Sequence, residues 1–216
     1  EYNNPYTLCE LYNRKGFALE TGHQPYEAIK SFNISKEIAR ANNLQIQMAL
    51  SSSNIAVVYT DLQQYHLGLI ELEKQLPTLE TFERVRNIVP FVKSYAILLY
   101  RMGQVSKSID QFKKALEVNN GMFLILETSC RTWLSRIYFE LGQIEQSKEQ
   151  RALSTIELNE NYFGEMSWIL YNYWWVGEQL EQPSTYINEI FLKLLLENPL
   201  DHPEFDIFLS SLEPQE

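Results

Sequence analysis

A pattern of small and apolar residues recurs along the chain with a period close to 40 residues. The four clearest copies read GFALETGHQPYEAIKSFNIS (16–35), AVVYTDLQQYHLGLIELEKQ (56–75), LLYRMGQVSKSIDQFKKAL (98–116) and SRIYFELGQIEQSKEQRALST (135–155). The same small position recurs at intervals of 40, 40 and 39 residues, as Gly16, Ala56, Ala96 and Ser135. A fifth copy places Trp174 there. Such a period is typical of units that bury their apolar face only by stacking on their neighbours.

Within each copy the apolar spacing predicts two antiparallel helices. Helical i, i+3 and i+4 spacing leads up to Gly103, where the first helix of the third copy should end. A second helix should follow over 104–118, with its inward face made of Ile109, Phe112, Ala115 and Leu116. Eight glycines and eight prolines in 216 residues are too few for the turns of a sandwich or barrel. We therefore predict an all-α chain.

The positions that repeat resemble those of the tetratricopeptide repeat (TPR), whose pattern is W-x2-L-G-x2-Y, then A-x3-F, then proline. The third copy matches best, through Leu99, Gly103, Val105, Ser108, Phe112, Ala115 and Leu116. The chain departs from the family in its long period and in having no closing proline. It is similar to the divergent, long-period versions found in bacterial signalling and regulatory proteins. The resemblance implies an α-α superhelix, or solenoid, of about five antiparallel helix hairpins with a short C-terminal capping segment.

The repeat also sets the expected domain organisation. Residues 1–197 should form one repeat domain, and 198–216 should form a C-terminal cap or tail. The copies are expected at 8–42, 46–78, 83–119, 122–158 and 162–197. In the tail, a short helix is expected to cap the last hairpin through Phe205, Ile207, Phe208, Leu209 and Leu212.

Charge and motifs narrow the function classes. A net charge of −10 argues against direct nucleic-acid contact, because phosphate binding needs a basic face. No apolar run approaches the roughly 20 residues of a membrane span. The two cysteines and three histidines have no metal-ligand spacing, and glycine-rich phosphate loops and nucleophile motifs are absent. We expect no enzyme activity, no cofactor and no metal. A cytoplasmic location is favoured, with a periplasmic sensor domain as the alternative.

Polar residues of the predicted first helices are the candidate partner contacts. By the resemblance, these helices line the concave surface where TPR arrays hold a peptide. Four equivalent positions, each three residues before the small residue of its copy, should form a row: Asn13, Ser53, Lys93 and Thr132. The other candidates are Arg14, Asn54, Tyr100, Arg101, Arg136, Tyr171, Asn172 and Trp175. The cations among them favour an acidic peptide or a free carboxyl terminus.

The leading hypothesis is a non-catalytic module that binds a protein or peptide, as the sensor or regulatory part of a larger signalling or transcription-regulating protein. Two alternatives involve the aromatic stretch YFGEMSWILYNYWWVG (162–177). It could make a homodimer or scaffold interface, or its Trp168, Tyr171 and Trp175 face could bind a small ligand. A third reading makes it an aromatic core that closes the last repeat.

Overall fold

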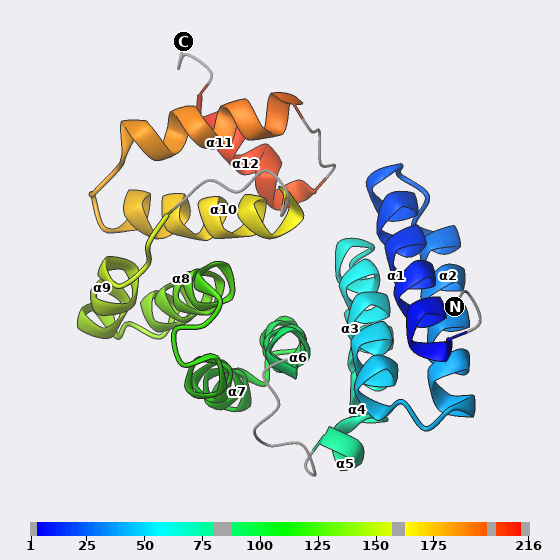
Figure 1. Ribbon diagram of the computed structural model, residues 1–216. Coiled ribbons are helices and arrows are strands. Elements are labelled where there is room, and N and C mark those ends of the chain that lie inside the picture. The colour runs from blue at the N-terminus through cyan, green and yellow to red at the C-terminus, as the bar shows by residue number, and fades with distance from the viewer. Residues whose placement is uncertain (1–3, 80–87, 157–162, 198–201, 213–216) are drawn as a thin grey trace. The chain divides into compact units, whose positions relative to one another are not determined.

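The computed structural model describes residues 4–79, 88–156, 163–197 and 202–212, and all regular structure within them is helical (Figure 1). Consecutive helices pair as antiparallel hairpins. The predicted all-α hairpin array is confirmed. By its contacts the chain divides into two compact units, unit 1 (Glu1–Asn120) and unit 2 (Gly121–Glu216).

Unit 1 contains three hairpins. Its helices are α1 (Pro5–Thr21), α2 (Pro25–Ala41), α3 (Gln45–Asp61), α4 (Tyr65–Glu73), the short α5 (Leu76–Leu79), α6 (Val89–Arg101) and α7 (Val105–Asn119). Helix α3 contacts α1, α2, α4 and α6, so the first helices of successive hairpins lie against one another.

Unit 2 contains two hairpins and a final helix. Its helices are α8 (Leu124–Glu140), α9 (Ile144–Ala152), α10 (Phe163–Gln179), α11 (Thr185–Glu197) and α12 (Pro203–Ser211). Helix α10 contacts both α8 and α11. Helix α12 packs on this group as the expected cap: Phe205 and Phe208 are buried, whereas Ile207, Leu209 and Leu212 stay exposed.

The repeated small residues lie where the two helices of a hairpin approach each other. Each has a small partner twelve residues later in the second helix, and the pairs Ala96–Ser108 and Ser135–Ser147 are joined by hydrogen bonds. Ser108 Oγ donates to the Ala96 carbonyl at 2.7 Å, and Ser135 Oγ donates to the Ser147 carbonyl at 2.8 Å. A serine hydroxyl on one helix reaches the backbone carbonyl of the other, so the two backbones are close together. Only small side chains fit between helices that approach so closely.

The hairpin turns share one backbone conformation. The first helix of the third copy ends at Arg101, and Gly103 follows in the turn with a φ of +75°. The equivalent residues His23, Gln63 and Glu181 adopt a φ of +57°, +57° and +55° without being glycine. In every such turn the next residue is glutamine, whose backbone N–H donates to the carbonyl five residues earlier. This closing bond satisfies a carbonyl at the helix end.

Candidate functional site

The predicted row of four equivalent polar residues is buried. Asn13, Ser53, Lys93 and Thr132 have exposed fractions between 1% and 9%. In unit 1 helix α3 contacts both α1 and α6, and in unit 2 helix α8 contacts α10, so neighbouring helices of the same unit cover these side chains. The row is therefore not an open strip of polar side chains, and contact with a partner stays a prediction for it.

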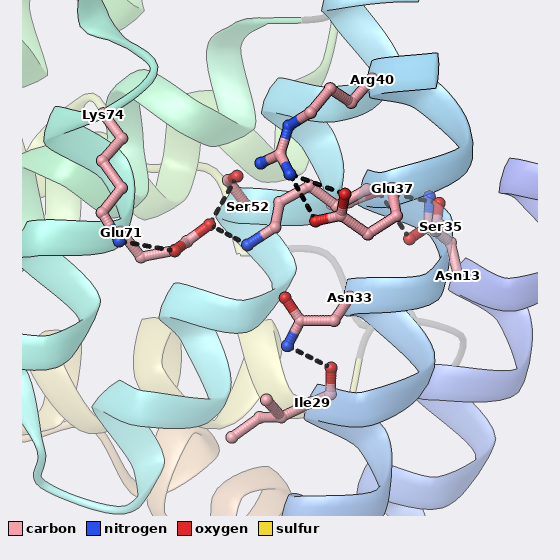
Figure 2. A network of polar contacts seen from close by, with 11 residues as sticks. Asn13, Ile29, Asn33, Ser35, Glu37, Arg40, Ser52, Glu71 and Lys74 are labelled. Atoms are coloured by element: carbon pink, nitrogen blue, oxygen red, sulfur yellow. Dashed lines mark hydrogen bonds and ion pairs between the residues drawn. The ribbon is translucent and has the colours of Figure 1, made fainter. Parts of the chain in front are cut away.

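In unit 1, the candidates of the first two copies meet across α1 and α3. Ser51 Oγ and Asn54 Nδ2 lie 3.2 Å and 3.5 Å from Asn13 Oδ1. Ser53 Oγ donates to Ser94 Oγ on α6 at 3.2 Å. Figure 2 shows the surrounding polar network, in which Asn13 lies near Ser35. These bonds fix the register between hairpins.

The remaining candidates of unit 1 lie apart from that group. Arg14 is exposed on α1. At the end of α6, the guanidinium carbon of Arg101 is 5.7 Å from the Tyr65 ring centroid and 5.9 Å from that of Tyr100. Unit 1 thus distributes its candidates over separate places.

In unit 2, three candidates converge on the guanidinium of a fourth. Arg136 extends from α8, and its Nη1 donates to Asn172 Oδ1 on α10 at 3.2 Å. Its guanidinium carbon lies 5.1 Å from the Trp175 ring centroid and 5.5 Å from that of Tyr171. Trp133, which the sequence reasoning missed, adds a third ring at 5.8 Å. We call these five residues the Arg136 site.

Helix α12 supplies a carboxylate to the Arg136 site. Glu204 Oε2 lies 2.5 Å from Arg136 Nη1, and Glu140 Oε1 on α8 lies 3.1 Å from Arg136 Nε. His202 caps the start of α12, where its Nδ1 accepts from the Glu204 N–H at 3.2 Å. No spacing rule connects Glu204 to an arginine 68 residues earlier, so sequence reasoning missed this contact.

Two phenylalanines of α12 enter the aromatic core of unit 2. The Phe205 ring centroid lies 4.9 Å from Trp168 and 5.7 Å from Tyr171. The Phe208 centroid lies 5.1 Å from Trp174 and 4.4 Å from Phe191. The aromatic stretch of α10 therefore forms an interior core that α12 completes.

The burial of this stretch bears on the two alternative functions. Over residues 164–177, where side-chain exposure is described, Trp168, Tyr173 and Trp175 are half-buried and Tyr171 and Trp174 are buried. No aromatic side chain in this range is exposed to meet a second subunit. The half-buried rings keep part of their surface accessible, and a dimer interface through them stays a prediction.

The Arg136 site can bind a carboxylate and aromatic side chains together. Arginine suits carboxylates because its planar fork of donors matches two oxygens, and it also stacks on rings. Asn172 is fully buried, and among the described residues its Nδ2 has no hydrogen-bond acceptor. A buried donor in this state is suited to an acceptor from a bound segment.

The described part of the chain offers neither a metal-binding cluster nor a membrane-spanning helix. No group of three or more histidine, cysteine, aspartate or glutamate side chains there could hold a metal ion. Among the described helices, none is long and apolar enough to cross a membrane.

Comparison with known proteins identifies the fold. No protein-family model and no curated protein matches the sequence. A solved structure from Podosopora anserina, a kinesin light chain-like protein with nearly identical TPR-like repeats, aligns with a TM-score of 0.62 at 12% identity. The alignment covers 99% of this chain and 100% of that one. A single-substitution variant of that protein also aligns at 0.62 and 12% identity, over 91% and 97%.

A Bacteroides ovatus structure described as a protein-binding protein covers 94% of this chain and 95% of its own. Its TM-score is 0.34 at 14% identity, too low for an argument about the fold. The resemblance seen in the sequence is thus matched by the Podosopora structures at the level of fold. The chain has the TPR-like helical-repeat fold.

Proposed function

We propose that the chain is a non-catalytic protein-interaction module whose unit 2 binds an acidic, aromatic peptide segment at the Arg136 site. The observation that carries the proposal is the docking of α12. A separate helix there places Glu204 on Arg136 and Phe205 and Phe208 among the rings of α10 and α11. We further propose, by analogy of fold, that the module is the sensor or regulatory part of a larger protein.

Electrostatics favour a carboxylate as the anchor of the bound segment. The side chains of Arg136 and Glu204 are 10% and 15% exposed, so water screens their attraction little. The three rings around the guanidinium restrict its orientation before any ligand arrives. A pre-oriented cation loses less side-chain entropy when it pairs, which favours affinity.

Aromatic side chains are the second requirement for the bound segment. Trp168 and Tyr171 accept the edge or face of a phenylalanine at 4.9–5.7 Å between centroids. Buried aromatic anchors next to an arginine are the residue types that carry most binding energy in protein interfaces. A segment with only a carboxylate should therefore bind weakly.

The test is selection from a random peptide library on two proteins, the wild-type chain and Glu204→Gln. We expect enriched peptides to combine Asp or Glu with phenylalanine, tyrosine or tryptophan. In the Glu204→Gln background, Arg136→Gln should weaken a selected peptide by roughly 30-fold or more, because it removes a buried charged partner. Fluorescence anisotropy with a labelled peptide measures this change.

Arg151→Gln is the matched control. Arg151 also lies over a ring, with its guanidinium carbon 4.1 Å from the Tyr173 centroid, but its described partners, Tyr173 and Gln182, lie outside the Arg136 site. Its loss should leave peptide affinity within twofold. The proposal fails if neither protein enriches a peptide, or if enriched peptides bind equally well without Arg136.

A further inference from the structure

We infer that α12 is a replaceable occupant of the Arg136 site, and that a helical partner segment with the same Glu-Phe-x-x-Phe pattern displaces it. The inference rests on the proposed function and adds its regulation and the form of its ligand. It concerns residues 204–208, which read EFDIF.

The docked face of α12 consists of three side chains with distinct roles. Glu204 pairs with Arg136, Phe205 contacts Trp168 and Tyr171, and Phe208 contacts Trp174 and Phe191. Residues three apart lie on the same side of a helix, so both rings enter the core together. The recognised pattern is therefore an acidic residue followed directly by phenylalanine, with a second phenylalanine three positions later.

The helix itself is short and depends on docking. Helix α12 has nine residues, fewer than an isolated helix needs to be stable in water. Its start is fixed by the His202 cap and by proline at its first position. When it undocks, the freed segment should lose its helical structure, so docking and folding of α12 are one equilibrium.

Undocking α12 would leave the rest of unit 2 assembled. Helix α10 keeps its contacts with α8 and α11, and the buried residues Ile169, Leu170 and Ile187 belong to the core of those helices. The opposite side of α12 is uncovered, with Ile207 54%, Leu209 39% and Leu212 40% exposed. One layer of contacts therefore holds α12.

A site occupied in cis binds a partner more weakly than an open site. The apparent dissociation constant rises by the inverse of the fraction of molecules in which the site is open. A minor open state of about 1–10% predicts a roughly 10–100-fold tightening when α12 is weakened. The residues between Glu197 and Pro203 are few, so the local concentration of α12 is high.

The experiment compares three forms of the 216-residue chain. They are the wild type, a double variant that carries Glu204→Gln and Phe205→Ala, and a control, Ser210→Ala, whose substitution lies on the exposed side of α12. The probe is a labelled peptide of residues 202–212, HPEFDIFLSSL. The control is the same peptide with glutamine in place of its glutamate, which we call the glutamine peptide. We expect the double variant to bind the probe at least tenfold tighter than the other two proteins. It should bind the glutamine peptide weakly.

Hydrogen exchange of α12 in the wild-type chain supplies a second measurement that needs no variant. A saturating peptide selected for the Arg136 site should speed amide exchange in 203–211 while slowing it in α10. Equal peptide affinity for all three proteins, or slower exchange in α12 with peptide bound, would show that α12 is a permanent cap and overturn the inference. Absence of any peptide binding to any protein would instead refute the proposed function.

Discussion

A buried ion pair between the first two hairpins should contribute far more stability than an exposed pair of the same length. Lys36 Nζ on α2 lies 2.6 Å from Glu71 Oε1 on α4, and the two side chains are 9% and 10% exposed. Lys30 and Glu27 on α2 are also 2.6 Å apart, but they are 69% and 53% exposed. The two pairs differ in burial, which makes them a matched comparison.

The magnitude follows from what each substitution leaves behind. Lys36→Met leaves the Glu71 carboxylate buried with a hydrogen bond from Ser52 Oγ at 2.8 Å and with Lys74 Nζ at 3.8 Å from its other oxygen (Figure 2). Removing one partner of a buried pair costs about 3–5 kcal/mol. Lys30→Met should cost at most about 0.5 kcal/mol, since exposed helix pairs contribute little.

Exchange of backbone amides in α2, α3 and α4, followed by mass spectrometry, can measure both changes. All four tryptophans lie in unit 2, at 133, 168, 174 and 175, so tryptophan fluorescence would not report on unit 1 directly. We expect Lys36→Met to speed exchange of the most protected amides roughly 10²- to 10⁴-fold, which is the fold-change that corresponds to about 3–5 kcal/mol.

A double substitution separates pairing from packing. Lys36→Met combined with Glu71→Leu replaces the whole pair by apolar side chains and should recover most of the lost stability. The reasoning is wrong if Lys36→Met destabilises unit 1 no more than Lys30→Met. It is also wrong if the double variant is less stable than Lys36→Met alone.

Three further substitutions or conditions test the packing and the turns. Gly16→Ala should destabilise unit 1 by about 1–3 kcal/mol in urea unfolding followed by circular dichroism, because the added Cβ would lie 2.3 Å from the buried Phe32 ring. Gln63→Gly should stabilise it by about 1 kcal/mol in the same assay, since glycine adopts the φ of +57° without steric cost. Desolvation raises the pKa values of Glu20 and Asp61, and the protonated carboxyl of one hydrogen-bonds the other. The stability that this carboxyl pair contributes should be present in acid and be lost as the pH rises through neutrality. Glu20→Gln should therefore flatten the profile of melting temperature against pH between pH 5 and about pH 8. Solvent at the exposed Asp61 reduces the size of this effect.

The fold could be predicted because its determinants recur. Ala96 and Ser135 mark the close approach of two helices by their position in the repeat alone, and their burial confirms it. In the predicted second helix of the third copy, Phe112 and Ala115 are buried, while Ile109 and Leu116 are half-buried. Periodicity identifies the packing face of a helix but not how deeply each member is covered.

The turns show that a left-handed conformation does not require glycine. Glycine occupies this position at the third and fourth turns, yet His23 and Gln63 adopt the same left-handed conformation. The common feature is the glutamine that follows, whose backbone N–H closes the turn. A backbone bond of this kind leaves only a weak trace in the sequence, because any residue except proline can donate it.

The candidate site was predictable only in part, because contacts between copies depend on how the hairpins stack. Arg136 was nominated from the fourth copy and Tyr171, Asn172 and Trp175 from the fifth, and the structure brings them together. Glu204 could not be nominated, since its pairing with Arg136 depends on where the tail packs.

An acidic partner would compete with Glu204 for Arg136. The cations on the first helices favour an acidic partner, and the described structure already places an acidic side chain of the same chain on Arg136. A partner segment that displaces Glu204 exchanges one ion pair with Arg136 for another. Its carboxylate alone therefore adds no net binding free energy. The aromatic anchors of a partner likewise replace the ring contacts that Phe205 and Phe208 already make. A partner must therefore gain from contacts beyond those of Glu204, Phe205 and Phe208. For that reason affinity for the wild-type chain should depend more on the residues flanking the acidic-aromatic core than on the core itself.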